Sequence, residues 1–199
     1  ILNVLKDGSP AAVGKIGSSE CRALYSLLKG REMSDLDYHD IFVGAGVFPP
    51  TVEALHNFCD IFLDHLHDLD IVAKWLGDAE DFLLEAYCPS ASKVVLRKLE
   101  PYYWDEPWSR ELKNKTVLVI SPFSDTITSQ YELRTKLWEN DEVLPEFTLK
   151  TIKCPLSWYF DTPKDGSWVD ELSKLKDQMT KESFDVCLIG AGAWSVPLA

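Results

Sequence analysis

The clearest pattern of apolar and polar positions lies at residues 115–134, KTVLVISPFSDTITSQYELR. Val117–Ile120 is an apolar run too short for a helix of its own, and its β-branched side chains favour a buried strand. Ser124 and Asp125 follow, and larger side chains then recur at helical spacing, at Ile127, Tyr131, Arg134 and Trp138. The pattern predicts a central strand, a loop, and a helix whose first N–H groups are capped by Ser124 or Asp125.

The same order of elements appears near the start of the chain. Ala11–Ile16 predicts a first strand, entered from a turn at residues 7–10. The strand ends at Gly17, and a helical stripe follows it, made of Cys21, Leu24, Tyr25 and Leu28. A second strand, turn and helix unit is therefore predicted here.

Further elements lie between these two units. Ile41–Ala45 predicts a strand, and the glycines and prolines of residues 44–50 predict the turn after it. The strongest helical stripe follows, at Val52, Leu55, Cys59, Phe62, Leu63 and Leu66. Periodicity does not separate strand from helix at Ile71–Trp75 and Phe82–Tyr87, so both alternatives stay open there.

An aromatic segment, EPYYWDEPWSR at residues 100–110, precedes the central strand. Its rings stand between two prolines, which is typical of a loop or lid laid across a cleft. The rings either stack on a base or sugar or are buried against the rest of the domain.

The last third of the chain continues the alternation. Thr148–Cys154 predicts a strand, residues 158–160 form a Trp, Tyr and Phe cluster, residues 161–167 predict a turn, and Phe184–Ile189 predicts another strand. A helix is predicted between them by Trp168, Leu172, Leu175 and Met179. Strands that alternate with helices predict an α/β fold: a mostly parallel sheet flanked by helices, with right-handed connections.

Two turns of this fold are candidate sites for an anion. Ligands of open parallel sheets bind outside the carboxyl ends of the strands, where helix N-termini present unpaired N–H donors. The loop at residues 121–125 is one such turn. The turn at Gly17 is the other, with Lys15 as a nearby cation and Glu20 in the first turn of the helix. The alternative is that Ser19 and Glu20 only cap that helix.

A third turn follows the last strand. Gly190 and Gly192 match the first two glycines of GxGxxG, but Ser195 stands at the third position. A dinucleotide site also needs an acidic residue about 20 positions further on, which the 199 residues do not contain. The pattern therefore disfavours a nicotinamide oxidoreductase and predicts a glycine turn at the edge of the same sheet.

Other titratable residues give weaker signals. Asp35 and Asp37 form a DxD triplet, but such triplets arise by chance among 32 acidic residues, so a solvated loop is favoured. His56, His65 and His67 lack a fourth ligand and are expected at the surface. A histidine beside an aspartate, at residues 39–40, either orients a general base or is an ordinary loop histidine.

Composition narrows the class of partner. The formal net charge of −12 disfavours nucleic acid and anionic lipid, although local N–H groups and a few basic side chains can still hold a small anion. The five cysteines are widely spread without CxxC spacing, which predicts buried thiols in a reducing compartment. No apolar run approaches the ~18 residues of a membrane span, and no signal peptide is evident. We expect a soluble cytoplasmic protein without a membrane span.

Four motifs together resemble a known family. They are KIGSSE at 15–20, GAGVFPPT at 44–51, SPFSDTITSQY at 121–131 and FDVCLIGAGAWSVPLA at 184–199. The set resembles glycosyltransferases of the GT-D fold, particularly their relatives in large viruses and in bacterial polysaccharide clusters. The resemblance spans most of the chain. It implies a Rossmann-like domain that binds a nucleoside diphosphate sugar and passes the sugar to an acceptor glycan. The length of 199 residues suits one domain and both ends look cut, so we expect residues 1–199 to be a single domain excised from a longer protein.

The resemblance also implies residue roles. The family typically carries Asp-x-Glu in the first turn, which contacts the diphosphate and its Mn or Mg ion; here Ser18 stands at the Asp position and Glu20 keeps the Glu. Glu20 is the expected base or metal ligand, and Lys15 is expected to stabilise the departing diphosphate. The expected donor-binding residues are Gly17, Ser18, Ser19, Ser121, Pro122, Phe123, Ser124, Gln130, Arg134, Gly190, Ala191 and Gly192. The alternative for Arg134 is a surface residue with a packed stem.

Two other functions remain open at this stage. One is a nucleotide- or glycan-binding module without catalysis, which the serine at position 18 would fit. The other is an NAD-dependent oxidoreductase. The sequence does not specify the donor nucleotide, the hexose or deoxyhexose transferred, the acceptor, or the stereochemical outcome.

Overall fold

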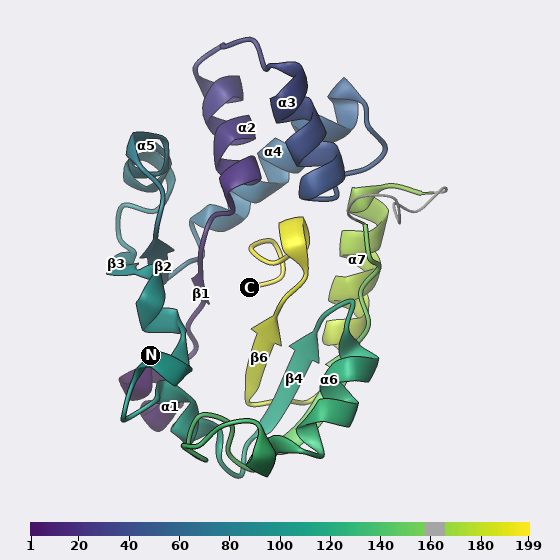
Figure 1. The fold of residues 1–199 in the computed structure, drawn as a ribbon. Helices are drawn as coiled ribbons and strands as arrows, with labels where there is room; N and C mark the ends of the chain where they lie inside the picture. Colours follow the sequence, from purple (N-terminus) through teal and green to yellow (C-terminus); the bar gives the residue numbers. More distant parts are fainter. Residues whose placement is uncertain (158–165) are drawn as a thin grey trace.

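The computed structural model describes residues 1–157 and 166–199. It contains two three-stranded parallel sheets, with strand orders β1-β2-β3 and β5-β4-β6, flanked by helices (Figure 1). The α/β class is therefore confirmed. The single mostly parallel sheet that the sequence predicted is instead divided into two sheets of three strands each.

The first sheet uses short strands. Its strands are β1 (Val13–Gly14), β2 (Ile71–Lys74) and β3 (Ser92–Val95), and the helices of this half are α1 (Leu2–Asp7), α2 (Ser18–Leu28) and α5 (Asp78–Tyr87). The two undecided segments are thus a strand, β2, and a helix, α5. Strand β1 is much shorter than the predicted Ala11–Ile16, and it pairs with β2 through Val13 and Gly14.

The strand predicted at Ile41–Ala45 is wrong. Helix α3 (Asp35–His39) runs directly into a π-helical turn, Asp40–Gly44, and the Ala45 N–H donates to the Asp40 carbonyl at 2.8 Å. Ile41 is fully buried in this turn. A short apolar run fits a buried strand or a buried helical turn equally well, because periodicity cannot separate them. The predicted helix that follows is confirmed as α4 (Val52–Leu66).

The second sheet confirms the predicted alternation. Its elements are β4 (Thr116–Ile120), α6 (Ser124–Tyr131), β5 (Thr148–Ile152), α7 (Trp168–Met179) and β6 (Val186–Ile189). Strand β4 is central, and Ile120 lies opposite both Ile152 and Ile189. The aromatic cluster at 158–160 and the first part of the turn predicted at 161–167 lie outside the described residues.

Several connections are short 3₁₀ segments. They are Leu96–Leu99, Pro101–Tyr103, Trp108–Leu112, Arg134–Lys136 and Gly192–Trp194. Tyr102, Tyr103 and Trp104 of the aromatic segment are 39–51% exposed, and Tyr102 stacks on Trp138 with a centroid distance of 5.2 Å. Helix α6 ends at Tyr131, so the predicted stripe up to Trp138 does not continue as one helix.

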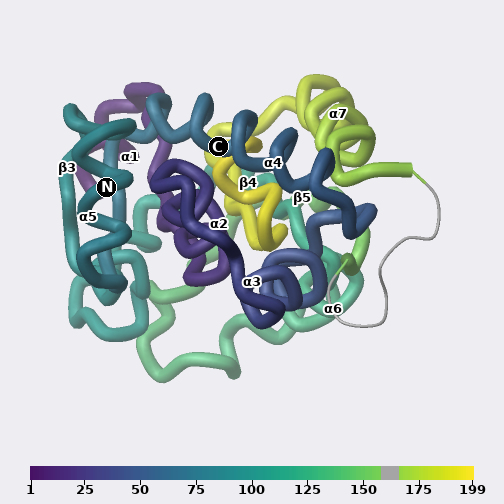
Figure 2. Tube along the Cα trace, turned by 90° about the horizontal axis from the view of Figure 1, so that it is seen from above, coloured from purple at the N-terminus to yellow at the C-terminus, as the bar shows by residue number. Residues whose placement is uncertain are grey.

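The main core joins the C-terminal turn to the helices beside it. Trp168 at the start of α7 and Trp194 after β6 are both buried, with near-parallel rings 6.3 Å apart between centroids. The Trp194 indole N–H donates to the Trp168 carbonyl at 3.0 Å. Seen from above, β4 and the C-terminal segment lie between α2 on one side and α4 and α7 on the other (Figure 2).

The composition predicted buried, unpaired cysteines and no membrane-spanning helix. All five cysteines are free, and four of them are buried. Burial raises the pKa of each thiol, to about 11 or about 12. Among the described residues, no helix combines the length and the apolar character needed to cross a bilayer.

Candidate functional site

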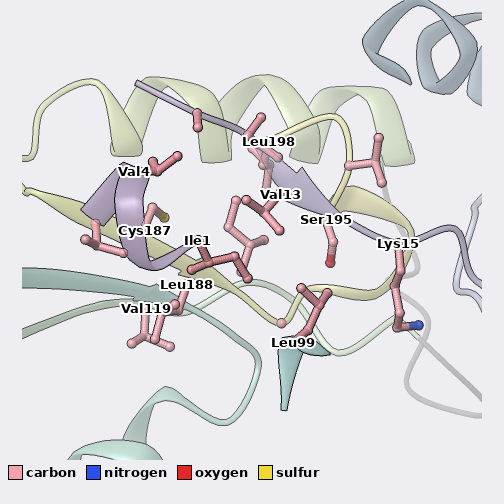
Figure 3. Close-up of a pocket in the computed structure, with 18 of the residues that line it drawn as sticks. Ile1, Val4, Val13, Lys15, Leu99, Val119, Cys187, Leu188, Ser195 and Leu198 are labelled. Carbon is pink, nitrogen blue, oxygen red and sulfur yellow. The ribbon is translucent and has the colours of Figure 1, made fainter. Parts of the chain in front are cut away.

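The three predicted turns meet at one cavity of about 1170 Å³ between β1 and β6 (Figure 3). Strands β1, β4 and β6 run in the same direction, so their carboxyl ends lie on the same side of the molecule (Figure 1). The residues that follow these strands and line the cavity, here named the polar end, are Lys15, Gly17, Glu20, Ser121, Gly190, Gly192 and Ser195. Sequence reasoning had placed these residues at separate turns, and the structure brings them together.

Glu20 is held against the first turn. Gly17 is the N-cap of α2, in an extended conformation with φ −72° and ψ 156°. A Cβ atom on Gly17 would stand 2.6 Å from the Glu20 carboxyl carbon, closer than non-bonded atoms can approach. Burial raises the pKa of Glu20, while the hydrogen bond from its own backbone and the positive charge of Lys15 act in the opposite direction. The result is a carboxyl group in a cavity wall with a raised pKa, as general bases often have.

Lys15 is positioned by a residue that the sequence did not single out. The Lys15 ammonium lies 5.0 Å from the centroid of the Trp75 ring, a cation–π geometry. The Trp75 indole N–H donates to the Ile16 carbonyl at 2.8 Å, which ties the end of β2 to the loop after β1. Trp75 is 44% exposed, so part of this aromatic ring borders the mouth of the turn. Its only signal in the sequence was an aromatic residue directly after a strand.

Hydrogen bonds of Ser121 fix the central turn, which follows β4. Ser121 is buried, its N–H donates to the Ile152 carbonyl at 3.1 Å, and its hydroxyl accepts from the Phe123 N–H at 3.2 Å. The predicted cap is wrong: Phe123 is the N-cap of α6, and within the described chain no side chain caps this helix. Ser124 is already the first residue inside the helix, and its side chain is buried. The first N–H groups of α6 therefore remain available to an anion.

The C-terminal turn needs its second glycine. Gly192 has φ +59°, in the left-handed region that side chains other than glycine rarely adopt. Its Cα also approaches the loop of residues 44–46, because an added Cβ would stand 3.5 Å from the Ala45 carbonyl. The Ser195 hydroxyl accepts a hydrogen bond from the Ala191 N–H at 3.1 Å. The serine that breaks the GxGxxG pattern thus closes the turn.

Other expected donor-binding residues lie away from the cavity wall. Ser18 and Ser19 open helix α2, and Gln130 is exposed on α6 beyond its first turn. Arg134 forms an ion pair with Glu146 at 3.3 Å and lies 5.3 Å from the Tyr131 ring centroid. Pro122 and Phe123 belong to the central turn, where Phe123 is 53% exposed. The structure thus groups six of the candidate residues at the polar end, together with Ser195. It leaves these others outside the cavity lining, as it does Ser124 and Ala191.

A second cation near the central turn was missed. Lys153 follows β5 and forms an ion pair with Asp125 in the first turn of α6. The Lys153 side chain is 61% exposed. It lies at the carboxyl end of a strand that neighbours β4, where a positive charge can act on an anion bound at the start of α6. A single lysine within the predicted strand Thr148–Cys154 carries too little signal to be selected from sequence.

The DxD triplet and the histidines have structural contacts. Asp37 accepts from Ser34 in a capping box and pairs with Arg22 at 3.3 Å, and the hydrogen bonds from Ser34 lower its pKa. His65 contacts the Ile61 carbonyl through Nδ1 and Lys176 through Nε2, both at 2.8 Å. Across residues 1–157 and 166–199, no three His, Cys, Asp or Glu side chains are grouped to hold a metal ion.

The residues at the polar end fit a Mn or Mg ion only together with a bound diphosphate. Glu20 is the carboxylate beside the three turns. The cavity lining also contains Glu100, which follows the segment Leu96–Leu99, and Asp185, which lies before β6 and accepts a hydrogen bond from the Thr116 N–H. Magnesium is commonly held by one or two carboxylates, substrate phosphates and water. Glu20 could supply one such ligand, with the remaining ligands coming from the donor and from solvent.

The arrangement can bind an anion beside a carboxylate. It combines a cation, uncapped helix N–H groups and backbone amides of a glycine turn with a carboxyl group of raised pKa. Comparison of the chain with known proteins finds no matching family model, curated protein or solved structure.

Proposed function

We propose that this chain is a GT-D-like glycosyltransferase domain that moves a sugar from a nucleoside diphosphate sugar to a hydroxyl group of an acceptor glycan. The observation that carries the proposal is the meeting of three turns, after β1, β4 and β6, at one cavity. Two of these turns lead into helices, α2 and α6, whose N-termini attract anions. A diphosphate is the anionic group that such a set of turns suits.

The reaction assigns a separate role to each charged group. The acceptor oxygen attacks the anomeric carbon, and its proton passes to the Glu20 carboxylate as the new glycosidic bond forms. The bond from the anomeric carbon to the diphosphate oxygen breaks, and the diphosphate leaves with the electron pair. Lys15 and the amides of the central and C-terminal turns stabilise that negative charge. A Mn or Mg ion, when bound, would neutralise further charge on the diphosphate.

The raised pKa of Glu20 supports its role as the base. A general base works best when its pKa lies near the working pH, and burial moves this carboxyl group in that direction. Gly17 is needed for this position of Glu20, because a side chain at residue 17 would displace the Glu20 carboxylate.

A binding module without catalysis is the second candidate. The observation that favours it is Ser18, which stands where the resembled family carries an Asp and which opens α2 outside the cavity wall. Such a module would bind nucleotide or glycan tightly and would not turn over a donor.

A thermal-shift screen tests the donor class. Uridine, guanosine and thymidine diphosphates and their sugars are each added with and without Mn or Mg, because a ligand that binds the folded state raises the unfolding midpoint. We expect a shift with one nucleoside diphosphate family, reduced in Lys15→Ala and retained in Lys181→Ala, which changes an exposed lysine away from the cavity. A shift with NAD or an isolated glycan alone would contradict the transferase proposal.

A further inference from the structure

The cavity continues beyond the polar end into an apolar slot between β1 and β6. The side chains of this slot include Val13, Val119, Cys187, Leu188, Leu99 and Val4 (Figure 3). Both facing strands thus contribute to its wall, together with Leu99 from the segment after β3. The total volume of about 1170 Å³ exceeds the ~300–1,000 Å³ of ordinary small-molecule pockets.

Both strands that face the slot have an unpaired edge. Among the strands that the structure describes, β1 pairs with β2 alone and β6 pairs with β4 alone. The Ala12 carbonyl accepts hydrogen bonds from the N–H groups of Asp70 and Ile71, at the start of β2. Because backbone groups alternate sides along a strand, those of Val13 point away from β2 and toward the slot. Val13 and the residues of β6 are half-buried. Strand edges are usually paired or covered in folded proteins.

The two sheets have the order expected of one sheet from which a strand is missing. The orders are β3-β2-β1 and β6-β4-β5, and every pairing is parallel. Strands β1 and β6 run the same way on either side of the slot (Figure 1). One more parallel strand could therefore pair with both edges at once and join the two sheets.

We propose that this slot receives one more parallel strand, supplied by the same polypeptide C-terminal to residue 199. The chain leaves β6 at its carboxyl end, and consecutive strands of an α/β fold are usually neighbours joined by a crossover connection. Strands β5 and β6 both lie beside β4 in this way, which leaves the free edge of β6 as the next position. The inserted strand is apolar and rich in β-branched residues, because its side chains meet an apolar wall.

The proposal does not depend on the proposed function. A strand in the slot would end beside the polar end, but it fills the apolar part of the cavity whether the polar end binds a sugar nucleotide or another anion. Its test therefore uses structural readouts and no activity assay.

Photocrosslinking in the full natural polypeptide tests the proposal. A diazirine amino acid replaces Val13 in one variant and Cys187 in another, and the cross-linked peptides are identified by mass spectrometry. We expect both labels to react with one segment C-terminal to residue 199. Cross-links confined to residues 1–199, or formed with a separate polypeptide, would overturn the proposal. The same label at Val52, which is 61% exposed, is the control and should react mainly with water.

Hydrogen exchange provides a measurement without any substitution. In the full natural polypeptide, the amides of β1 and β6 should exchange as slowly as those of the central strand β4, and the segment that fills the slot should be protected with them. Fast exchange along both facing strands, with β4 protected, would overturn the proposal even if a labelled variant fails to fold.

Discussion

The carboxyl group of Glu20 lies directly over the Cα atom of Gly17, three residues before it in the chain. A Cβ atom at position 17 would stand 2.6 Å from the Glu20 carboxyl carbon, so only glycine leaves room for this arrangement. The relationship links the backbone of the first turn to the Glu20 carboxylate on the cavity wall.

Gly17→Ala should therefore displace the Glu20 carboxylate. We expect a loss in the free energy of unfolding smaller than the ~1–3 kcal/mol that overpacking a rigid core costs, because the clashing atoms are the end of a flexible side chain. We also expect weaker binding of the nucleoside diphosphate identified by the screen. Gly77→Ala is the matched control, since Gly77 is also the N-cap of a helix but an added Cβ would meet no atom within 4 Å among the described residues. Equal losses in the two variants, measured by urea unfolding, would contradict this account of Gly17.

The raised pKa of Glu20 predicts a pH dependence of stability. The folded state binds the Glu20 proton more tightly than the unfolded state, in which the pKa of this carboxyl group is near 4.5. The corresponding stabilisation is complete below that pH and is lost as the pH rises through the folded-state pKa. Glu20→Gln removes the titration, so the variant should gain stability relative to the wild type as the pH rises above 4.5.

Urea unfolding at several pH values measures this difference. Glu53→Gln, which changes an exposed residue in the first turn of α4, serves as the control for a generic loss of one carboxylate. A difference between wild type and Glu20→Gln that stays constant across the range would show that Glu20 is not perturbed as described.

The Tyr131 hydroxyl should contribute to the stability of the second sheet. It accepts from the Phe147 N–H at 2.6 Å and lies 2.9 Å from the Phe147 carbonyl and 3.2 Å from the Pro145 carbonyl, to which it can donate. Tyr131→Phe leaves the Phe147 N–H without this partner, and we expect a loss of about 1–3 kcal/mol. Tyr38→Phe, at a hydroxyl with no hydrogen bond to the described residues, should change the thermal midpoint much less; similar shifts in both variants would argue against the predicted role.

Gly46 should tolerate no side chain. Its φ is +81°, and an added Cβ would stand 2.7 Å from the Ser157 carbonyl oxygen and 2.9 Å from the carbonyl carbon. Gly46→Ala adds a backbone clash to the strain of a left-handed residue, so we expect it to cost more than Gly8→Ala. Gly8 has a φ of +68° but open space around it, which isolates the strain, worth about 1 kcal/mol. Chemical denaturation of the two variants measures the difference, and equal costs would exclude the clash.

The helices and strands with a strong apolar periodicity were predictable from sequence. The elements whose conformation depends on tertiary packing were not. The alternation from β4 to β6 and the helix α4 follow from apolar stripes that only one secondary structure fits. The π-helical turn at Asp40–Gly44 was missed because its apolar run fits a strand as well. The division into two sheets depends on which strands pair along their edges, and the local sequence pattern does not determine this pairing.

The candidate site was predictable in part for the same reason. Glycine and serine turns after strands are visible in the sequence, and seven of their residues do line one cavity. Trp75 and Lys153 act through contacts with Lys15 and Asp125, which are distant in sequence, so their positions could be found only from the fold.

Turnover of a nucleoside diphosphate sugar tests the central claim most directly. The release of nucleoside diphosphate is measured with a glycan acceptor present, for the wild type, Glu20→Gln and the Glu53→Gln control. The account predicts release by the wild type and the control, and a rate ~10²–10⁴-fold lower in Glu20→Gln with donor binding retained. No release with any donor that binds, or equal release by all three proteins, would contradict the assignment of this cavity as a glycosyl-transfer site with Glu20 as its base.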